Sequence, residues 1–89
     1  MAGTLYTQAY SDLRAALVSA RNEAGLSQAQ LAHVLGKPPS FVGKYELGER
    51  RIDVIELLVI LRALDVQRHV LLDQLEAVLP DRLGRYEKG

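Results

Sequence analysis

The feature that most constrains this chain is a continuous stretch, residues 25–53, that holds two short runs of helical periodicity separated by a few residues. The first run opens at Ser27, a residue type that favours the N-cap position, and Gln30 follows three places later, as a capping box requires. Gly36 is typical of the residue that follows the end of a helix. The Pro-Pro pair after it suits the first turn of another helix, where a missing N–H does no harm. The stretch therefore predicts two short helices joined by a tight turn.

A longer helix is predicted upstream of this pair. Ser11 is its expected N-cap, and apolar residues recur behind it at spacings of three and four as far as Gly25, which suits the helix end. Residues 1–10 carry no charge and little periodicity, and we interpret them as a frayed N-terminal arm that can be helical near its end.

Two more helices are predicted downstream. Asp53 is placed to cap a helix over residues 54–64, and a fifth helix over residues 68–79 would be ended by the proline that follows it. The tail, residues 80–89, is polar. Five helices in a chain of this length predict an all-α fold, with residues 11–79 forming one compact domain.

Composition argues against enzyme chemistry. The chain has no cysteine, which excludes disulfides and thiolate metal sites, and its two histidines, His33 and His69, lie on different predicted helices. We find neither a glycine-rich phosphate loop nor an activated nucleophile, so we expect no enzyme, no metal and no other cofactor. Residues 54–64 form an apolar run too short to span a bilayer, and no leader pattern opens the chain. We therefore expect a cytoplasmic protein without membrane contact.

The net charge of the chain is zero, which counts mildly against binding to nucleic acid. The distribution of the charge matters more than the sum. Basic residues fall in and just after the helix pair: Lys37, Lys44, Arg50 and Arg51. A DNA-binding face is compatible with this pattern, with a modest charge and salt-sensitive binding.

These landmarks together resemble the lambda-repressor-like, Xre-type helix-turn-helix family. The resemblance covers about residues 13–66. It rests on Arg21 before the AGLSQ sequence, the QxxLA pattern of residues 28–32, Gly36, Val42, and the KYELGERR sequence of residues 44–51. It implies a compact five-helix lambda-repressor-like domain, in which the second helix of the motif enters the major groove of double-stranded DNA. It also implies a transcription regulator that binds a palindromic operator as a homodimer.

The outward face of the second motif helix holds the expected base-contacting residues. Ser40 and Lys44 lie one turn apart there, and lysine donates to guanine O6 and N7, while serine serves either kind of base. The alternative for Lys44 is a phosphate contact or a solvated side chain. Gln28, in the first turn of the preceding helix, is expected to meet a phosphate, with a solvated surface role as the alternative.

Phe41 flanks this face, and two roles remain open for it. The ring either packs on a thymine methyl group of DNA or folds back into the core. Lys37, Arg50 and Arg51 are expected to bind phosphates, and the alternative is a solvated charge cluster.

A structural ion pair is implied by the family resemblance, between Arg21 on the first helix and Glu46 on the third. Glu46 shares a helix face with Val42 and Tyr45, so it points inward and needs a partner.

The last two predicted helices carry more apolar surface than one small domain can bury, which favours a dimer. The expected interface residues are Val70, Leu71, Leu75 and Val78. The alternative is that Leu71 and Leu75 close the core of the monomer. A core of this size offers no obvious ligand pocket, so we expect no small-molecule effector.

Four residues depart from the family pattern, in which polar or basic side chains are common: Pro39, Gly43, Leu47 and Glu49. They predict fewer direct base contacts and more dependence on DNA shape. The principal expectation is a sequence-specific transcription regulator, a repressor. The alternative is a protein-interaction module of the same fold with weak or no DNA binding.

Overall fold

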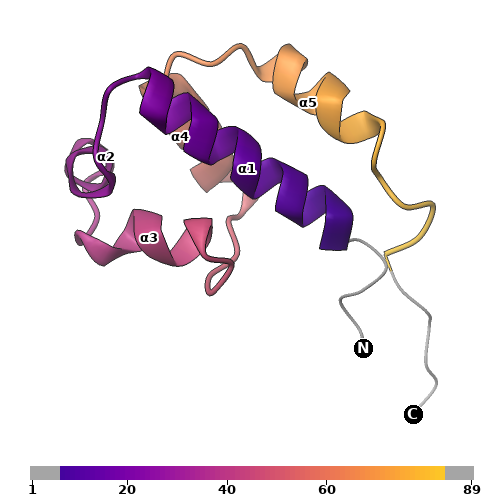
Figure 1. The fold of residues 1–89 in the computed structure, drawn as a ribbon, viewed down its shortest axis with the longest axis horizontal. Coiled ribbons are helices and arrows are strands. Elements are labelled where there is room, and N and C mark those ends of the chain that lie inside the picture. Colours follow the sequence, from indigo (N-terminus) through magenta and orange to yellow (C-terminus); the bar gives the residue numbers. More distant parts are fainter. Residues whose placement is uncertain (1–6, 84–89) are drawn as a thin grey trace.

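The computed structural model describes residues 7–83, which form five helices without a strand in that range (Figure 1). The helices are α1 (Thr7–Glu23), α2 (Gln28–Leu35), α3 (Ser40–Glu46), α4 (Val54–Ala63) and α5 (Arg68–Glu76). The all-α fold predicted from the sequence is confirmed.

Helix α1 begins at Thr7, so the prediction that Ser11 caps it is wrong. Ser11 lies inside the helix. The turn before it is held by a hydrogen bond from Gln8 Nε2 to Asp12 Oδ1 at 2.6 Å and by the burial of Ala9. This tertiary packing extends the helix into the predicted arm, whose first six residues lie outside the described range.

Helix α2 begins and ends where its local signals predicted. Ser27 Oγ accepts a hydrogen bond from the backbone N–H of Gln30, and the Gln30 side chain accepts one from the backbone N–H of Ser27. Gly36 follows with a φ of 73°, a left-handed conformation that glycine adopts without strain. The backbone N–H of Lys37 then closes the end by donating to the carbonyl of Ala32.

Helix α4 has the predicted N-cap at Asp53, and its last residue is Ala63. Helix α5 ends at Glu76, three residues earlier than predicted. The backbone N–H of Val78 donates to the carbonyl of Leu75, three residues back, which tightens the chain before Pro80. Proline also disfavours helical backbone at the residue before it, so the helix cannot continue to Leu79.

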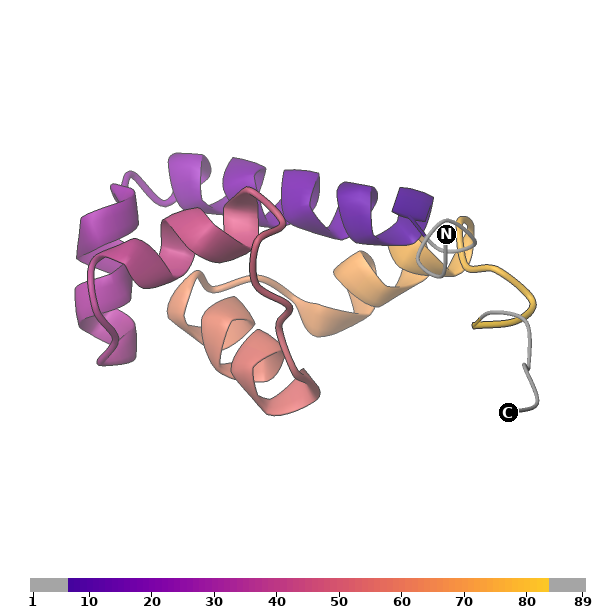
Figure 2. The same cartoon turned by 90° about the horizontal axis from the view of Figure 1, so that it is seen from below.

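The core lies between α1 and the other four helices. Helix α1 packs against α3 and α5, and α2 packs against α3 and α4. Figures 1 and 2 both show α5 alongside α1, with α2 at the opposite end of the molecule from the start of α1. The largest fully buried side chains are Leu17, Leu31, Val42, Tyr45, Ile60 and Leu61. Burial of one side of α3 leaves its other side free to form a site.

Candidate nucleic-acid interface

The outward face of α3 is uncovered. Ser40, Lys44 and Leu47 are exposed, while Val42 and Tyr45 on the opposite face are buried, as the helical period predicts. Leu47, the C-cap, is 73% exposed. Figure 2 shows α3 and the loop after it in front of the other helices. One hydroxyl, one ammonium group and one apolar side chain therefore stand on a single open surface.

The N-terminus of α2 is tied to α3 through Gln28. Its Nε2 donates a hydrogen bond to Glu46 Oε1 at 2.8 Å. Because the amide nitrogen carries two hydrogens, one is left after this bond is made. Gln28 is itself exposed, so part of its side chain is open to solvent.

Arg21 and Glu46 form an ion pair between α1 and α3. Arg21 Nε donates to Glu46 Oε2 at 2.7 Å and Nη2 donates to Oε1 at 3.1 Å, and the two side chains are only 12% and 6% exposed. The Arg21 Nη1 group also donates to the backbone carbonyl of Leu26. The hydrogen bond with Glu46 raises the pKa of Arg21 above its ordinary value, against the opposing effect of burial. The pair joins two helices and offsets the carboxylate charge near α3.

Phe41 belongs to the core. Its side chain is 7% exposed and meets the Tyr45 ring edge to face, with centroids 5.7 Å apart. A ring covered to this extent presents no open face to a thymine methyl group. Of the two roles that the sequence left open, the structure therefore shows the core role, and the expected DNA contact of Phe41 is corrected to a supporting one. Burial also raises the pKa of Tyr45 to about 12, so its hydroxyl stays neutral.

Two cations lie against the Phe41 ring. The Lys37 ammonium is 5.4 Å from the ring centroid, and the Arg50 guanidinium carbon is 4.7 Å from it. The ring quadrupole attracts both charges at these distances. Phe41 therefore lies beside two of the predicted phosphate-binding residues, while its own ring is nearly covered.

Arg50 is engaged in a two-pronged ion pair with Glu56. Its Nη2 donates to Glu56 Oε2 at 2.7 Å and its Nη1 donates to Oε1 at 3.0 Å. Glu56 also completes the capping box of α4, because it accepts from the backbone N–H of Asp53. The bonds from Arg50 and from that N–H lower the pKa of Glu56 to about 2. Much of the Arg50 charge is thus offset within the protein.

Arg51 follows in the same loop and is exposed. Its guanidinium carbon is 5.4 Å from the centroid of the Tyr10 ring on α1. Of the residues that the sequence assigned to DNA, Ser40 and Lys44 lie on α3 itself. The others, apart from Phe41, lie at the start of α2, in the turn and in the loop after α3: Gln28, Lys37, Arg50 and Arg51.

The predicted dimer residues do not share one surface. Leu71 is 3% exposed and belongs to the core, and Leu75 packs against that core. Val70 is exposed and Val78 is half-buried. The structure thus shows the alternative role for Leu71 and Leu75, which face α1. Four exposed large apolar side chains lie on α4: Val54, Ile55, Leu58 and Val59.

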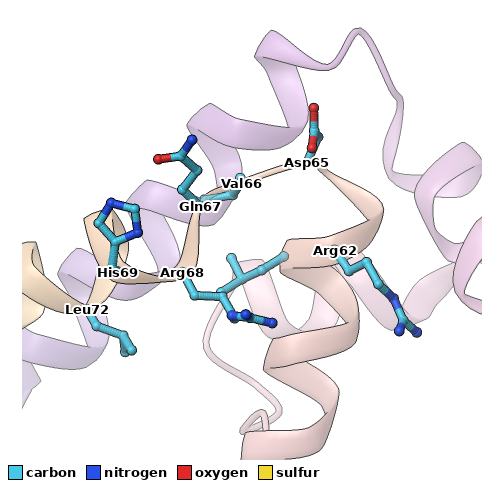
Figure 3. Close-up of a pocket in the computed structure, with 8 residues that line it drawn as sticks. Arg62, Asp65, Val66, Gln67, Arg68, His69 and Leu72 are labelled. Atoms are coloured by element: carbon cyan, nitrogen blue, oxygen red, sulfur yellow. The ribbon is translucent and has the colours of Figure 1, made fainter.

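An open hollow lies between the end of α4 and the start of α5 (Figure 3). In this view the side chains of Gln67 and His69 point away from those of Arg62 and Arg68, so the polar groups do not converge. Residues 7–83 contain no group of three or more histidine, aspartate or glutamate side chains placed to hold a metal ion. Within the same range, no helix has the length and apolar character needed to cross a membrane.

Two contacts of this site were not predicted from the sequence: the ion pair of Arg50 with Glu56 and the hydrogen bond from Gln28 to Glu46. The D-x-x-E pattern of residues 53–56 is a capping-box signature and could have placed Glu56 beside the loop that holds Arg50. The bond between Gln28 and Glu46 joins residues 18 positions apart, and no local signal indicates it.

Two short helices joined by a tight turn, the second with an exposed face, define a helix-turn-helix protein. A helix-turn-helix family model matches residues 17–71. A solved structure, an XRE-family like protein from Pseudomonas syringae pv. tomato str. DC3000, is similar with a TM-score of 0.78. Its sequence is 43% identical, and the match covers 86% of this chain and 94% of that one. No curated protein gives a significant match.

The chain therefore belongs to the Xre-type helix-turn-helix family, which is a family of DNA-binding regulators.

Proposed function

We propose that this protein is a sequence-specific transcription regulator that binds a palindromic operator as a homodimer. The observation that carries the proposal is the outward face of α3, where Ser40, Lys44 and Leu47 are exposed. A helix of this kind enters the major groove and lays its outward side chains along the base edges. In this proposal Lys44 donates to guanine O6 and N7, and Ser40 contacts a neighbouring base.

Phosphate contacts flank the helix in this proposal. Lys37 and Arg51 are exposed on either side of α3, and Gln28 has one amide hydrogen beyond its bond to Glu46. The first-turn N–H groups of α2 add donors, apart from that of Gln30, which donates to Ser27 Oγ, because they have no carbonyl partner within their own helix. Arg50 contributes less to phosphate binding, since its guanidinium is already paired with Glu56. Such contacts set the register of the protein on the duplex without reading its sequence.

The dimer face that we propose lies on α4, beside the exposed part of α5. Val54 and Ile55 are 70% and 68% exposed, and Leu58 and Val59 continue the apolar surface one turn further along the helix. A contiguous exposed apolar surface of this kind is typical of an interface. A two-fold axis here would present two copies of α3 to half-sites about 34 Å apart.

Repression is the action that we propose for this dimer. A protein held on promoter DNA by both copies of α3 occludes the surface that a polymerase must bind. This proposal places the protein in the cytoplasm, where bacterial DNA lies.

Two observations favour a second candidate, a protein-interaction module of the same fold with weak DNA binding. Leu47 puts an apolar side chain at the end of the α3 face, and Glu56 offsets the charge of Arg50. Both features lower the attraction of this surface for phosphates.

A gel-shift titration separates the two candidates. The protein is titrated onto the DNA upstream of its own gene at a low and at a moderate salt concentration. We expect tight binding that falls steeply with salt, because phosphate contacts release counterions. No detectable binding to upstream or random DNA at low salt would contradict the proposal and support the second candidate.

A further inference from the structure

Gly43 occupies a position where glycine has no conformational reason to be. The three other glycines that the structure describes, Gly25, Gly36 and Gly48, have positive φ angles of 74°, 73° and 81° just after helix ends. Gly43 lies inside α3 without a positive φ, where alanine would favour the helix more strongly. Its backbone freedom therefore does not account for it.

What Gly43 provides is room for the side chain of Gln28. A Cβ atom at position 43 would lie 3.2 Å from Gln28 Oε1, which is tighter than an ordinary contact, and 3.7 Å from Gln28 Cδ. The nitrogen of the same carboxamide donates to Glu46 Oε1. The carboxamide thus lies across the bare backbone of α3, between Gly43 and Glu46.

Glu46 determines which way this carboxamide faces. An ionised carboxylate only accepts hydrogen bonds, so the amide nitrogen of Gln28 must face Glu46 and the amide oxygen must face Gly43. Arg21 offsets the charge of Glu46 through a 2.7 Å contact, which lessens its repulsion of a phosphate nearby. The second hydrogen on Gln28 Nε2 is left for an acceptor outside the protein.

We propose that Gly43 is a positioning residue for DNA binding, which lets Gln28 lie across α3 and offer its second amide hydrogen to a DNA phosphate. The inference rests on the proposed function, and it deepens that function by assigning a role to a residue that lacks a side chain. Gly43 itself need not touch DNA.

The binding test compares the wild type, Gly43→Ala, Gln28→Ala and the double variant on an operator duplex and on a scrambled duplex. Each single variant is expected to bind both duplexes about tenfold more weakly, the effect of losing one hydrogen bond to a charged group. The salt dependence should not change, because the lost donor is neutral. The double variant should bind no more weakly than either single variant.

The Gln28→Ala background is the matched control for the added methyl group. If Gly43→Ala weakens binding further in that background, the methyl obstructs DNA directly and the inference is overturned. It is also overturned if Gly43→Ala leaves the wild-type affinity unchanged.

A measurement on the free protein separates this inference from the proposed function. In wild-type NMR spectra, one Gln28 side-chain amide hydrogen should resonate away from ordinary glutamine values and exchange slowly with solvent. A thermal melt first confirms that Gly43→Ala is folded. In this variant both Gln28 amide hydrogens should have the chemical shifts and exchange rates of an ordinary glutamine. Unchanged Gln28 resonances in this variant overturn the inference, whether or not the wild type binds DNA. If the wild type gives the expected Gln28 resonances but binds no DNA, the proposed function is contradicted and the phosphate role of Gln28 is overturned.

Discussion

Lys44 is the residue on which base recognition depends in this account, because it is the exposed cation within α3. Lys37 lies in the turn, against the Phe41 ring. We expect Lys44→Ala to lower operator binding by about 1–3 kcal/mol while leaving random DNA less affected. Lys37→Ala should weaken both duplexes alike and reduce the salt slope by about one. Fluorescence anisotropy on both duplexes checks this. Equal losses on both duplexes for Lys44→Ala would show that it contacts only phosphate.

The ion pair of Arg21 and Glu46 supports folding before it supports recognition. Both side chains are nearly covered, so removal of one leaves a charge without its partner. We expect Arg21→Ala or Glu46→Ala to lower the free energy of unfolding by roughly 3 kcal/mol, at the low end for buried pairs because some solvent contact remains. Urea unfolding of both single variants and the double variant checks this. A double variant as unstable as the sum of the singles would mean that the two residues do not interact.

At the scale of the element, Glu56 makes the start of α4 sensitive to acid. Its pKa is about 2 in the folded protein, against an ordinary value of 4.5. The contribution of Glu56 to stability is therefore complete above about pH 4.5 and is lost as the pH falls towards 2. We expect Glu56→Gln to be less stable than the wild type at neutral pH and to lose less stability over this acid range. Thermal melts at several pH values check this, and parallel curves for the two proteins would contradict it.

The elements whose boundaries could be predicted are those with local signals at both ends. Helix α2 lies between Ser27 and Gly36, and each acts through bonds to its own neighbours. The start of α1 could not be predicted, because Ser11 has the chemistry of a cap while the burial of Ala9 extends the helix past it. Tertiary packing outweighed a local preference there.

In the candidate site, too, some features follow from local sequence signals and others depend on the tertiary fold. The outward position of Ser40 and Lys44 follows from the helical period alone. The burial of Phe41 and the pairing of Arg50 with Glu56 depend on how the fold packs elements against one another, which periodicity does not contain. The sequence could therefore predict which residues border the site, but not which of their charges are already engaged.

At the scale of the whole molecule, the exposed face of α4 is the dimer interface that we propose. We expect the wild type to sediment as a dimer at micromolar concentration and Ile55→Asp to sediment as a monomer, because a carboxylate would be buried at the centre of an apolar contact. Val34→Asp on α2 is the matched control, since Val34 is also a large exposed apolar residue. If Val70→Asp dissociates the dimer and Ile55→Asp does not, the interface lies on α5 instead of α4. A monomeric wild type would contradict a dimer formed before DNA binding.

In the proposed dimer, α3 reads the DNA sequence twice, once in each protomer. The most direct test is competition, at one salt concentration, between a duplex selected by the protein from a random library and a scrambled duplex. We expect the selected duplexes to be inverted repeats with half-sites about 10 base pairs apart, bound about a thousandfold or more tightly than the scrambled control. Selection that enriches no sequence, with equal affinity for both duplexes, would contradict it.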